Sequence, residues 1–446
     1  MGRIDLRDQY AAQALKLADR LTPLERFYIE GYYYSGRPET TGRAIDAYTK
    51  CVTIDAGHQG CRHNLGLIYF QLERFAEAAE HYQHLVRRGG TFAITYQNLS
   101  LVTLAMGDAD RALEINAAYL KRNPENAAAH GSHAIILLAL NRPEEALRGF
   151  AQGMLLDAGN PLSAFGRGVA QIMREDWRAA TDIGSTLRKS ANATARYFGA
   201  VLEYQASMFR GMGADAVLAT ERAASAYKVP GERSSTAHSA AATILMSQGR
   251  TDLAVKAAER GRFEAKGTPA QRYTLVILAQ VLAAAGRQEE SAAAVTTLAG
   301  LVDPLAPVRD ARSVNLARGL AALARGDARD AIKPLEDAAA TLPARGASPL
   351  FPTSHVMIWT ALGRAYVEAG RMTDAVPWFE KAAASGVERV YYPEDYIRSF
   401  YYLGRIYAQR GEAAKAREAY RRFVSYWKDG DLDRDRVAEA QRKISS

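Results

Sequence analysis

The sequence has few cysteines and prolines and no long hydrophobic run. Two cysteines in 446 residues exclude a disulfide-rich scaffold, and 15 prolines and 35 glycines exclude collagen-like or low-complexity sequence. The best apolar stretch, residues 273–285, is interrupted by Gln280 and is far shorter than the roughly 20 residues that span a bilayer. The first residues contain no apolar segment of the kind found in signal peptides. With 48% hydrophobic residues and a net charge of +8, the composition indicates a folded, moderately basic protein.

An internal repeat is the strongest pattern in the sequence. A small residue recurs near the start of each expected second helix of a hairpin, first at exact steps of 34 and then at wider steps. The positions are Ala44, Ala78, Ala112, Ala146, Ala180, Ala216, Ala254, Ser291, Ala331, Ala375 and Ala416. A period of about 34 residues is that of the tetratricopeptide repeat. We therefore predict an all-α protein, a right-handed α-solenoid of about eleven tetratricopeptide-like hairpins with a C-terminal capping helix.

The regular repeats explain the pattern physically. Leu65 and Tyr69 are four residues apart and share one helical face, and Gly66 between them allows the partner helix to approach closely. After the turn, Ala78 and Tyr82 recur four residues apart, as on the buried face of a second helix. The two helices of each hairpin are therefore expected to bury their apolar faces against each other and against the next hairpin.

These patterns divide the chain into five segments. We expect an N-terminal helix over residues 1–21 that is either a partial hairpin or a cap, and regular 34-residue hairpins over 22–190. Degenerate hairpins are expected over 191–342, where alanine replaces the large aromatic residues and each side chain buries less area. Further hairpins are expected over 343–430, followed by a capping helix over 431–446.

The two ends of the repeat region carry a resemblance. The segment LTPLERFYIE at residues 21–30 resembles the opening of the C-terminal repeat region of bacterial serine/threonine protein kinases and related signalling regulators. The segment YRRFVSYWKD at residues 420–429 is similar to the close of the same regions. The resemblance implies a sensor or interaction region that serves a kinase or DNA-binding output domain, and a start in mid-hairpin favours a fragment of a longer chain. The kinase motifs themselves are missing from this sequence, so kinase activity is not expected.

No motif in the sequence predicts an active site. Residues 211–216 read GMGADA, which matches a dinucleotide-binding fingerprint, but they fall at a predicted turn between two helices and not after a strand. Cys51, His58, Cys61 and His63 lack the paired spacing of a zinc site, and we expect both cysteines to be free and packed as small apolar residues. Phosphate-binding loops, nucleophile elbows and zinc-protease helices do not occur. The sequence therefore predicts no enzyme, no cofactor and no metal.

The first helices of stacked hairpins are expected to line a concave groove that binds a partner. The candidate partner-binding residues are Arg26, Tyr33, His63, Asn64, Phe70, Gln97, Asn98, Leu101, Phe165, Arg364, Arg398, Tyr401 and Arg405. Asn64 and Asn98 are one repeat apart, and resemblance to tetratricopeptide proteins implies that a groove asparagine binds a peptide backbone. A carboxylate clamp for a chaperone tail is disfavoured, because Ala128 and Ser132 stand where the clamp has basic residues.

The sequence thus predicts a non-enzymatic scaffold for a protein or an extended peptide. The expected location is the cytoplasm, or outside it if a longer parent chain is tethered to a membrane. Binding of single-stranded nucleic acid is the alternative that the sequence pI of about 9.3 suggests, but the groove positions vary between repeats and offer no repeating code. Two further alternatives are an enzyme with an unrecognised site and a homo-oligomer formed through the N-terminal helix.

Overall fold

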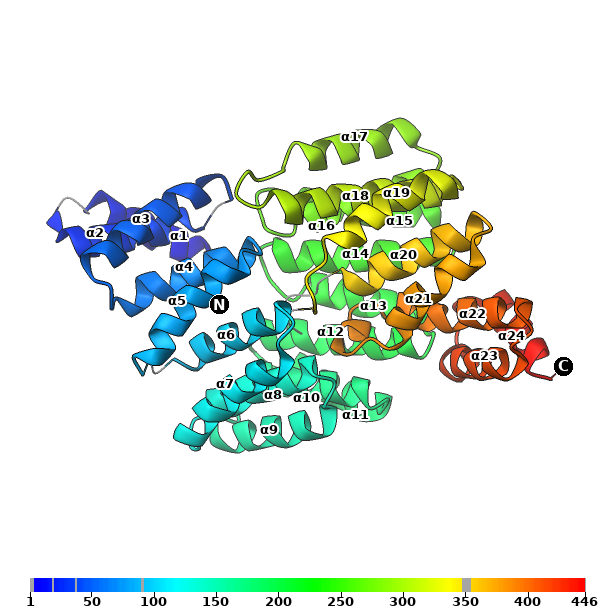
Figure 1. The fold of residues 1–446 in the computed structure, drawn as a ribbon, viewed down its shortest axis with the longest axis horizontal. Coiled ribbons are helices and arrows are strands. Elements are labelled where there is room, and N and C mark those ends of the chain that lie inside the picture. The colour runs from blue at the N-terminus through cyan, green and yellow to red at the C-terminus, as the bar shows by residue number, and fades with distance from the viewer. Residues whose placement is uncertain (1–3, 18–19, 37, 90–91, 347–353, 446) are drawn as a thin grey trace.

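In the computed structural model, every regular element is a helix. The structure describes residues 4–17, 20–36, 38–89, 92–346 and 354–445, and contains no strand within these ranges. Consecutive helices pair as antiparallel hairpins, and the hairpins follow one another round a superhelix (Figure 1). No helix in the described ranges combines the length and the hydropathy needed to cross a bilayer.

The hairpins consist of a first helix on the inner side and a second helix on the outer side. In the N-terminal half the pairs are α2 (Pro23–Tyr34) with α3 (Thr41–Ile54), α4 (Gln59–Gln71) with α5 (Phe75–Arg87), α6 (Ala93–Ala105) with α7 (Ala109–Arg122), α8 (Ala127–Ala139) with α9 (Pro143–Leu156), and α10 (Pro161–Met173) with α11 (Trp177–Arg188). The helix α1 (Ile4–Lys16) precedes them and packs on α2, and the 3-10 turn η2 (Pro38–Thr40) precedes α3.

The C-terminal half continues the same arrangement. Its pairs are α12 (Ala193–Phe209) with α13 (Gly213–Ala224), α14 (Glu232–Ser247) with α15 (Thr251–Glu264), α16 (Gln271–Ala284) with α17 (Gln288–Ala299), α18 (Pro307–Arg325) with α19 (Ala328–Ala340), α20 (His355–Glu368) with α21 (Met372–Ala383), and α22 (Pro393–Gln409) with α23 (Ala413–Trp427). The 3-10 turn η3 (Val387–Val390) precedes α22, and α24 (Arg434–Ser445) covers α23 at the C-terminal end. The prediction of an all-α helical-repeat solenoid is confirmed.

Close helix packing accounts for the repeated small residues. Ala44, Ala78 and Ala112 have no exposed surface, and each lies on the second helix of its hairpin. On the first helix, a Cβ added at Gly66 would lie 2.8 Å from the ring of Tyr82, too close for any side chain. The small residues therefore set how near the two helices of a hairpin approach, as the sequence pattern indicates.

A second periodic feature lies in the turns inside the hairpins. One residue of each early turn adopts a left-handed conformation: Glu73, Gly107, Asn141, Glu175 and Gly211, with φ between 58° and 101°. The first four are spaced by 34 residues, like the repeat itself. Gly211 belongs to the segment that matches a dinucleotide-binding fingerprint, and the structure places it in a helix–helix turn, where that motif has no strand before it.

These turns form the contact between successive windings of the superhelix. Both Nη atoms of Arg312 on α18 donate to the carboxylate of Glu73, and Arg309 Nη1 donates to the carbonyl of Gln71 at 2.5 Å. Further along, the backbone N–H of Ala344 donates to the carbonyl of Ala105 at 3.1 Å. Hairpins far apart in the sequence are therefore joined edge to edge.

The C-terminal hairpin closes the winding in the same way. Arg422 and Tyr426 on α23 both donate to the carboxylate of Glu175, the tyrosine hydroxyl at 2.6 Å. The indole Nε1 of Trp427 donates to the carbonyl of Met208 at 3.0 Å, and α12 contacts α22 directly (Figure 1). The solenoid is thus not an open trough over its whole length, since the C-terminal hairpins lie against the middle of the chain.

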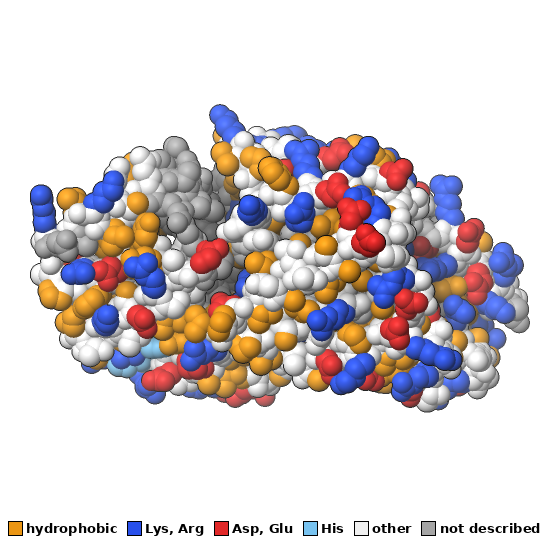
Figure 2. All heavy atoms as spheres, turned by 90° about the horizontal axis from the view of Figure 1, so that it is seen from above, with side chains coloured by type: hydrophobic (Ala, Val, Ile, Leu, Met, Phe, Trp, Pro, Cys, Tyr) orange, Lys and Arg blue, Asp and Glu red, His pale blue; other side chains and the backbone are white. Residues whose placement is uncertain are grey.

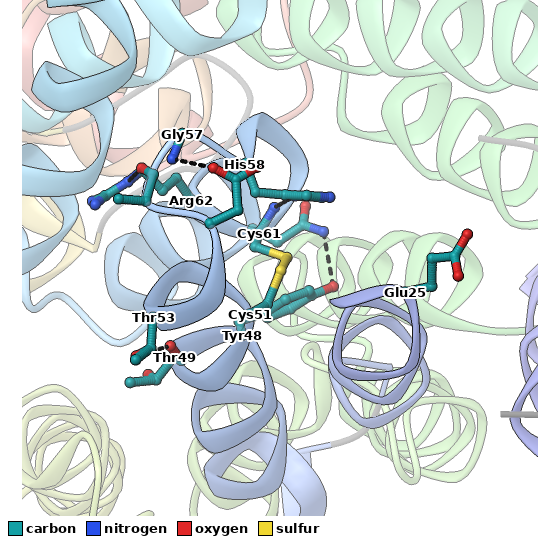
Figure 3. The surroundings of a disulfide bond; sticks show 12 residues. Glu25, Tyr48, Thr49, Cys51, Thr53, Gly57, His58, Cys61 and Arg62 are labelled. Carbon is teal, nitrogen blue, oxygen red and sulfur yellow. Dashed lines mark hydrogen bonds between the residues drawn. A yellow bond between two sulfur atoms is a disulfide. The ribbon is translucent and has the colours of Figure 1, made fainter. Parts of the chain in front are cut away.

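The two cysteines correct the sequence analysis, which expected free thiols. Cys51 at the end of α3 and Cys61 at the start of α4 form a disulfide that is fully buried (Figure 3). The short turn between the helices brings the two Cα atoms to 6.3 Å, within the range for a disulfide. The spacing of ten residues did not reveal this pairing, because it depends on how sharply the chain reverses between two helices.

Candidate binding surface on the inner side of the superhelix

The predicted groove asparagines have structural hydrogen bonds. The amide of Asn64 on α4 donates to the hydroxyl of Tyr48 on α3 at 2.8 Å. One repeat later, Asn98 on α6 donates to Tyr82 on α5 at 3.1 Å, and only 5% of Asn98 is exposed. The periodicity of these asparagines thus reflects a bond that joins each hairpin to the next.

Five further predicted residues of the N-terminal half pack within the wall of the superhelix. Leu101 is fully buried, Phe70 belongs to the hydrophobic core, and the ring of Phe165 stacks on Phe198 with centroids 4.5 Å apart. The side-chain oxygen of Gln97 accepts a hydrogen bond from Ser132 at 3.0 Å. In addition, His63 Nδ1 lies 3.0 Å from the hydroxyl of Thr95, and burial lowers the pKa of this histidine.

The remaining predicted residues are near the two ends. On α2, Arg26 forms an ion pair with Glu30 and keeps about half of its side chain exposed, and Tyr33 is half-buried against Tyr34. On α22, the hydroxyl of Tyr401 donates to Glu439 of the capping helix at 2.6 Å, which leaves Tyr401 buried.

Arg405, Arg398 and Arg364 differ in how far they are engaged. Arg405 is exposed, with its guanidinium over the Tyr401 ring at 5.9 Å from the ring centre. Arg398 forms ion pairs with Glu394 at 2.5 Å and Asp433 at 2.8 Å. Arg364 on α20 is 30% exposed, with its nearest carboxylate, that of Glu368, at 3.5 Å. The thirteen predicted residues therefore do not form one continuous surface, but Arg364 and Arg398 do lie beside a site that the sequence analysis missed.

That site is a cluster of tyrosines from first helices of different hairpins. Tyr197 and Tyr204 lie on α12, Tyr273 on α16, and Tyr391 and Tyr392 directly before α22. Helix α12 contacts α22, and each of the five tyrosines is near enough to another of them to raise the pKa of one member of the pair. We call these five residues the inner tyrosine cluster. The cluster is not apparent in the sequence, because its five residues lie in different hairpins of an alanine-rich region and do not recur at one position of the repeat.

The hydroxyl groups of the cluster are mostly unpaired. Within the described part of the chain, the hydroxyls of Tyr197, Tyr204, Tyr273 and Tyr391 form no hydrogen bond, and that of Tyr391 is itself buried. Burial raises the pKa of Tyr197 to about 12 and raises the pKa of the other three as well. The four side chains nevertheless keep some accessible surface. Phenol groups in this state can donate a hydrogen bond to water or to a bound partner.

Asp395 is the carboxylate next to the inner tyrosine cluster. Its Oδ1 accepts a hydrogen bond from Thr360 on α20 at 2.9 Å, and it forms no ion pair with any residue that the structure describes. Burial and the neighbouring Glu394 raise its pKa to about 6, although Arg398 and Arg364 oppose the shift. Asp395 is therefore ionised at neutral pH without a cation bound directly to it.

In this structure His58 caps the N-terminus of α4, and it does not form a set of metal ligands with Cys51 and Cys61. A ring nitrogen of His58 lies within 4.8 Å of both sulfur atoms, but the sulfurs are bonded to each other (Figure 3). His58 Nδ1 accepts the backbone N–H of Cys61 at 3.1 Å, which places the proton of the neutral ring on Nε2. Neither a thiolate nor a free ring nitrogen is then available to a metal ion.

The outer surface offers a pocket and mixed charge. A pocket of about 470 Å³ lies between α9 and α11 beside the start of α10, and its lining includes Arg167 and Asp182. On the face shown in Figure 2, basic and acidic side chains alternate and form no continuous basic stripe. The lining also includes the hydroxyls of Thr186 and Ser190, but among the described residues no hydrogen bond joins either hydroxyl to the carboxylate of Asp182.

Sequence comparison identifies the repeats. Tetratricopeptide-repeat family models match residues 59–89, 99–164, 316–388 and 355–428. These segments lie within the helical hairpins of the structure, and they are tetratricopeptide repeats. A search of curated proteins finds no matching relative.

Solved structures that resemble the chain do so at low sequence identity and low TM-score. A tetratricopeptide repeat protein from Parabacteroides merdae ATCC 43184 is 14% identical, with 57% of this chain and 98% of that chain covered and a TM-score of 0.42. YrrB, a protein with an unusual peptide-binding site, is 17% identical over 42% of this chain and 96% of its own, with a TM-score of 0.28. MamA is 15% identical over 38% of this chain and 96% of its own, with a TM-score of 0.31. These likenesses are too distant to carry an argument about function.

Proposed function

We propose that this protein is a non-enzymatic scaffold that holds a protein or an extended peptide against the inner side of its superhelix. The observation that carries the proposal is the inner tyrosine cluster, in which four hydroxyls form no hydrogen bond, near the carboxylate of Asp395, which forms no ion pair within the described residues. Tyrosine is enriched among the residues that dominate binding energy in protein interfaces, because it combines a large apolar ring with a hydrogen-bonding tip. Helical-repeat superhelices in general present such surfaces to extended partners.

The two competing functions have less support. An enzyme needs a nucleophile and a base that a substrate can reach, and the one hydroxyl that donates to Asp395 belongs to Thr360, which is only 2% exposed. A nucleic-acid-binding surface needs basic side chains gathered along a path, whereas acidic and basic side chains alternate on the visible face (Figure 2). Both therefore rank below partner binding.

We further propose that the chain is the interaction region of a bacterial signalling protein. This rests on the resemblance of residues 21–30 and 420–429 to the repeat regions of kinase-associated regulators. The Cys51–Cys61 disulfide supports a location outside the cytoplasm, since structural disulfides persist in oxidising compartments. A membrane-tethered parent chain with this region outside would satisfy both observations.

Selection from a phage-displayed library of random peptides tests the binding function. We expect peptides that bind the full chain in fluorescence anisotropy, and binding that weakens when Tyr204 and Tyr273 are both replaced by Ala. The matched control is Tyr10→Ala on α1, because Tyr10 is 62% exposed and lies outside the inner tyrosine cluster. Equal affinities for the double variant, the control and the unchanged protein would exclude this surface as the binding site.

A further inference from the structure

The ends of the hairpins form two edges along the superhelix. The turns inside the hairpins form one edge, which we call the turn edge, and the connections between successive hairpins form the other, which we call the loop edge. The early turns, with their left-handed residues Glu73, Gly107, Asn141, Glu175 and Gly211, belong to the turn edge. The hydrogen bonds between windings join this part of the turn edge to the later hairpins.

Apolar residues of the later loops cover these early turns. The 3-10 turn η3, in the loop between α21 and α22, contacts α10, and its Val387 and Val390 are buried. In the loop after α23, Leu432 is only 1% exposed, and the backbone N–H groups of Asp431 and Leu432 donate to the carbonyl of Gly211 at 2.8 and 3.2 Å. A loop edge therefore packs on a turn edge within one chain, through apolar side chains and backbone hydrogen bonds.

Glycines on the turn edge show where this contact ends. Gly211 is buried, and a Cβ added to it would lie 2.9 Å from the indole ring of Trp427. Each of the five later turns also contains a left-handed glycine, but these glycines are exposed, and an added Cβ would meet no described atom within 4 Å. They are Gly249, Gly286, Gly326, Gly370 and Gly411. The turn edge of the last five hairpins is therefore uncovered.

The loop edge of the earlier hairpins is uncovered as well. A Cβ added at Gly89, Gly231 or Gly267 would meet no described atom within 4 Å. Large apolar side chains are nevertheless exposed along this edge, at the ends of second helices or in the loops that follow, which is typical of an interaction surface. They are Ile54, Phe92, Leu155, Val229 and Phe263, with between 53% and 80% of each residue exposed.

The two uncovered edges lie on different faces of the molecule. Because the later loops already lie on the early turns, the early loops and the later turns are left on the two outer faces of the stacked windings. They therefore do not meet within one molecule. A second copy could place its first winding on the last winding of the first copy, and this would repeat the contact that the chain already forms with itself.

We propose that the uncovered turn edge of one copy binds the uncovered loop edge of a second copy, so that the chain assembles head to tail. The exposed apolar residues of the early loops take the place that the buried Val387, Val390 and Leu432 have in the contact within the chain. The two surfaces in the contact are different, so each added copy presents a free edge to the next and the assembly does not stop at a dimer. The inner side of the superhelix stays free for the proposed partner.

Sedimentation velocity of the full chain over a range of concentrations tests the association. We expect the average mass to rise with concentration beyond that of two chains of 48.7 kDa each. A protein that stays monomeric at every concentration, or that stops at a dimer, would overturn the proposal.

A charged residue placed on either edge should break the contact. Leu155→Glu with Phe263→Glu changes the loop edge, and Ala284→Glu with Ala408→Glu changes the turn edge, at exposed positions in the last turns of α16 and α22. Both double variants should be monomeric. Leu218→Glu is the matched control, because Leu218 is 51% exposed but lies in the middle of α13, away from both edges, and this variant should associate as the unchanged protein does. Circular dichroism should show equal helix content in all of these proteins.

Mixing the two double variants tests the head-to-tail arrangement itself. Each variant keeps the edge that the other has lost, so an equimolar mixture should form a 1:1 complex and nothing larger. A mixture that stays monomeric, or a Leu218→Glu control that associates as weakly as the double variants, would refute the pairing of these two edges. Either result leaves partner binding on the inner side untouched.

Discussion

Glu175 allows a quantitative test of how the superhelix closes. It lies in the turn between α10 and α11 with φ of 64°, a conformation that costs a residue with a side chain about 1 kcal/mol relative to glycine. Its carboxylate accepts hydrogen bonds from Arg422 and from the hydroxyl of Tyr426 on α23. The cost of the left-handed turn is thus offset by the hydrogen bonds that Glu175 forms between two windings of the superhelix.

The magnitude follows from these opposing contributions. The ion pair is about one third exposed on both sides, so we discount it for solvent screening to about 1 kcal/mol, and we add about 1 kcal/mol for the tyrosine hydroxyl. Glu175→Ala loses both bonds and keeps the strained backbone, which predicts a loss of about 2 kcal/mol. Glu175→Gly loses the bonds but relieves the strain, which predicts a loss of about 1 kcal/mol.

Hydrogen exchange measured by mass spectrometry is the suitable assay, because a long repeat array need not unfold in one step. We expect faster exchange in α23 for both variants, with Glu175→Ala more affected than Glu175→Gly, and little change in α4 and α5. In a cycle with Arg422→Ala, the coupling energy should be about 1 kcal/mol. Glu144→Ala is the control, since its pair with Arg174 is exposed and 3.4 Å long. An α23 that exchanges no faster in Glu175→Ala would refute the reasoning.

Three further predictions concern single contacts. Replacing Cys51 and Cys61 by Ser should lower the free energy of unfolding by about 2–3 kcal/mol, measured by chemical denaturation, and the unchanged protein should label with a thiol reagent only after reduction. Asp395→Asn should raise the free energy of unfolding at pH 7. The pKa of Asp395 is raised from 3.8 to about 6 in the folded protein, so folding takes up a proton between these pH values and the unchanged protein loses stability as the pH rises through that window. A stability difference between the two proteins that is independent of pH would contradict this. Asn98→Ala should cost about 1 kcal/mol in thermal or chemical unfolding, because it leaves the buried hydroxyl of Tyr82 without its donor, and unchanged stability would count against a structural role.

The sequence alone determined the helices, the hairpins and their order. These follow from contacts within about 40 residues, such as Gly66 against Tyr82, and a periodic pattern records such contacts directly. The same spacing predicts partner binding by Asn64 and Asn98, and this role stays a prediction. In the structure both amides donate to tyrosine hydroxyls of the preceding hairpin, a contact that the periodicity does not distinguish from ligand binding.

Only the tertiary structure decided which distant hairpins meet. Each hairpin is rotated slightly relative to the one before, and the sum of these rotations over several repeats brings α12 against α22 and Glu175 against Arg422. A repeat period records the length of a unit and not this small rotation, so neither the closure of the superhelix nor the inner tyrosine cluster is visible in the sequence. The disulfide escaped prediction for a related reason, since it depends on the angle of a single turn.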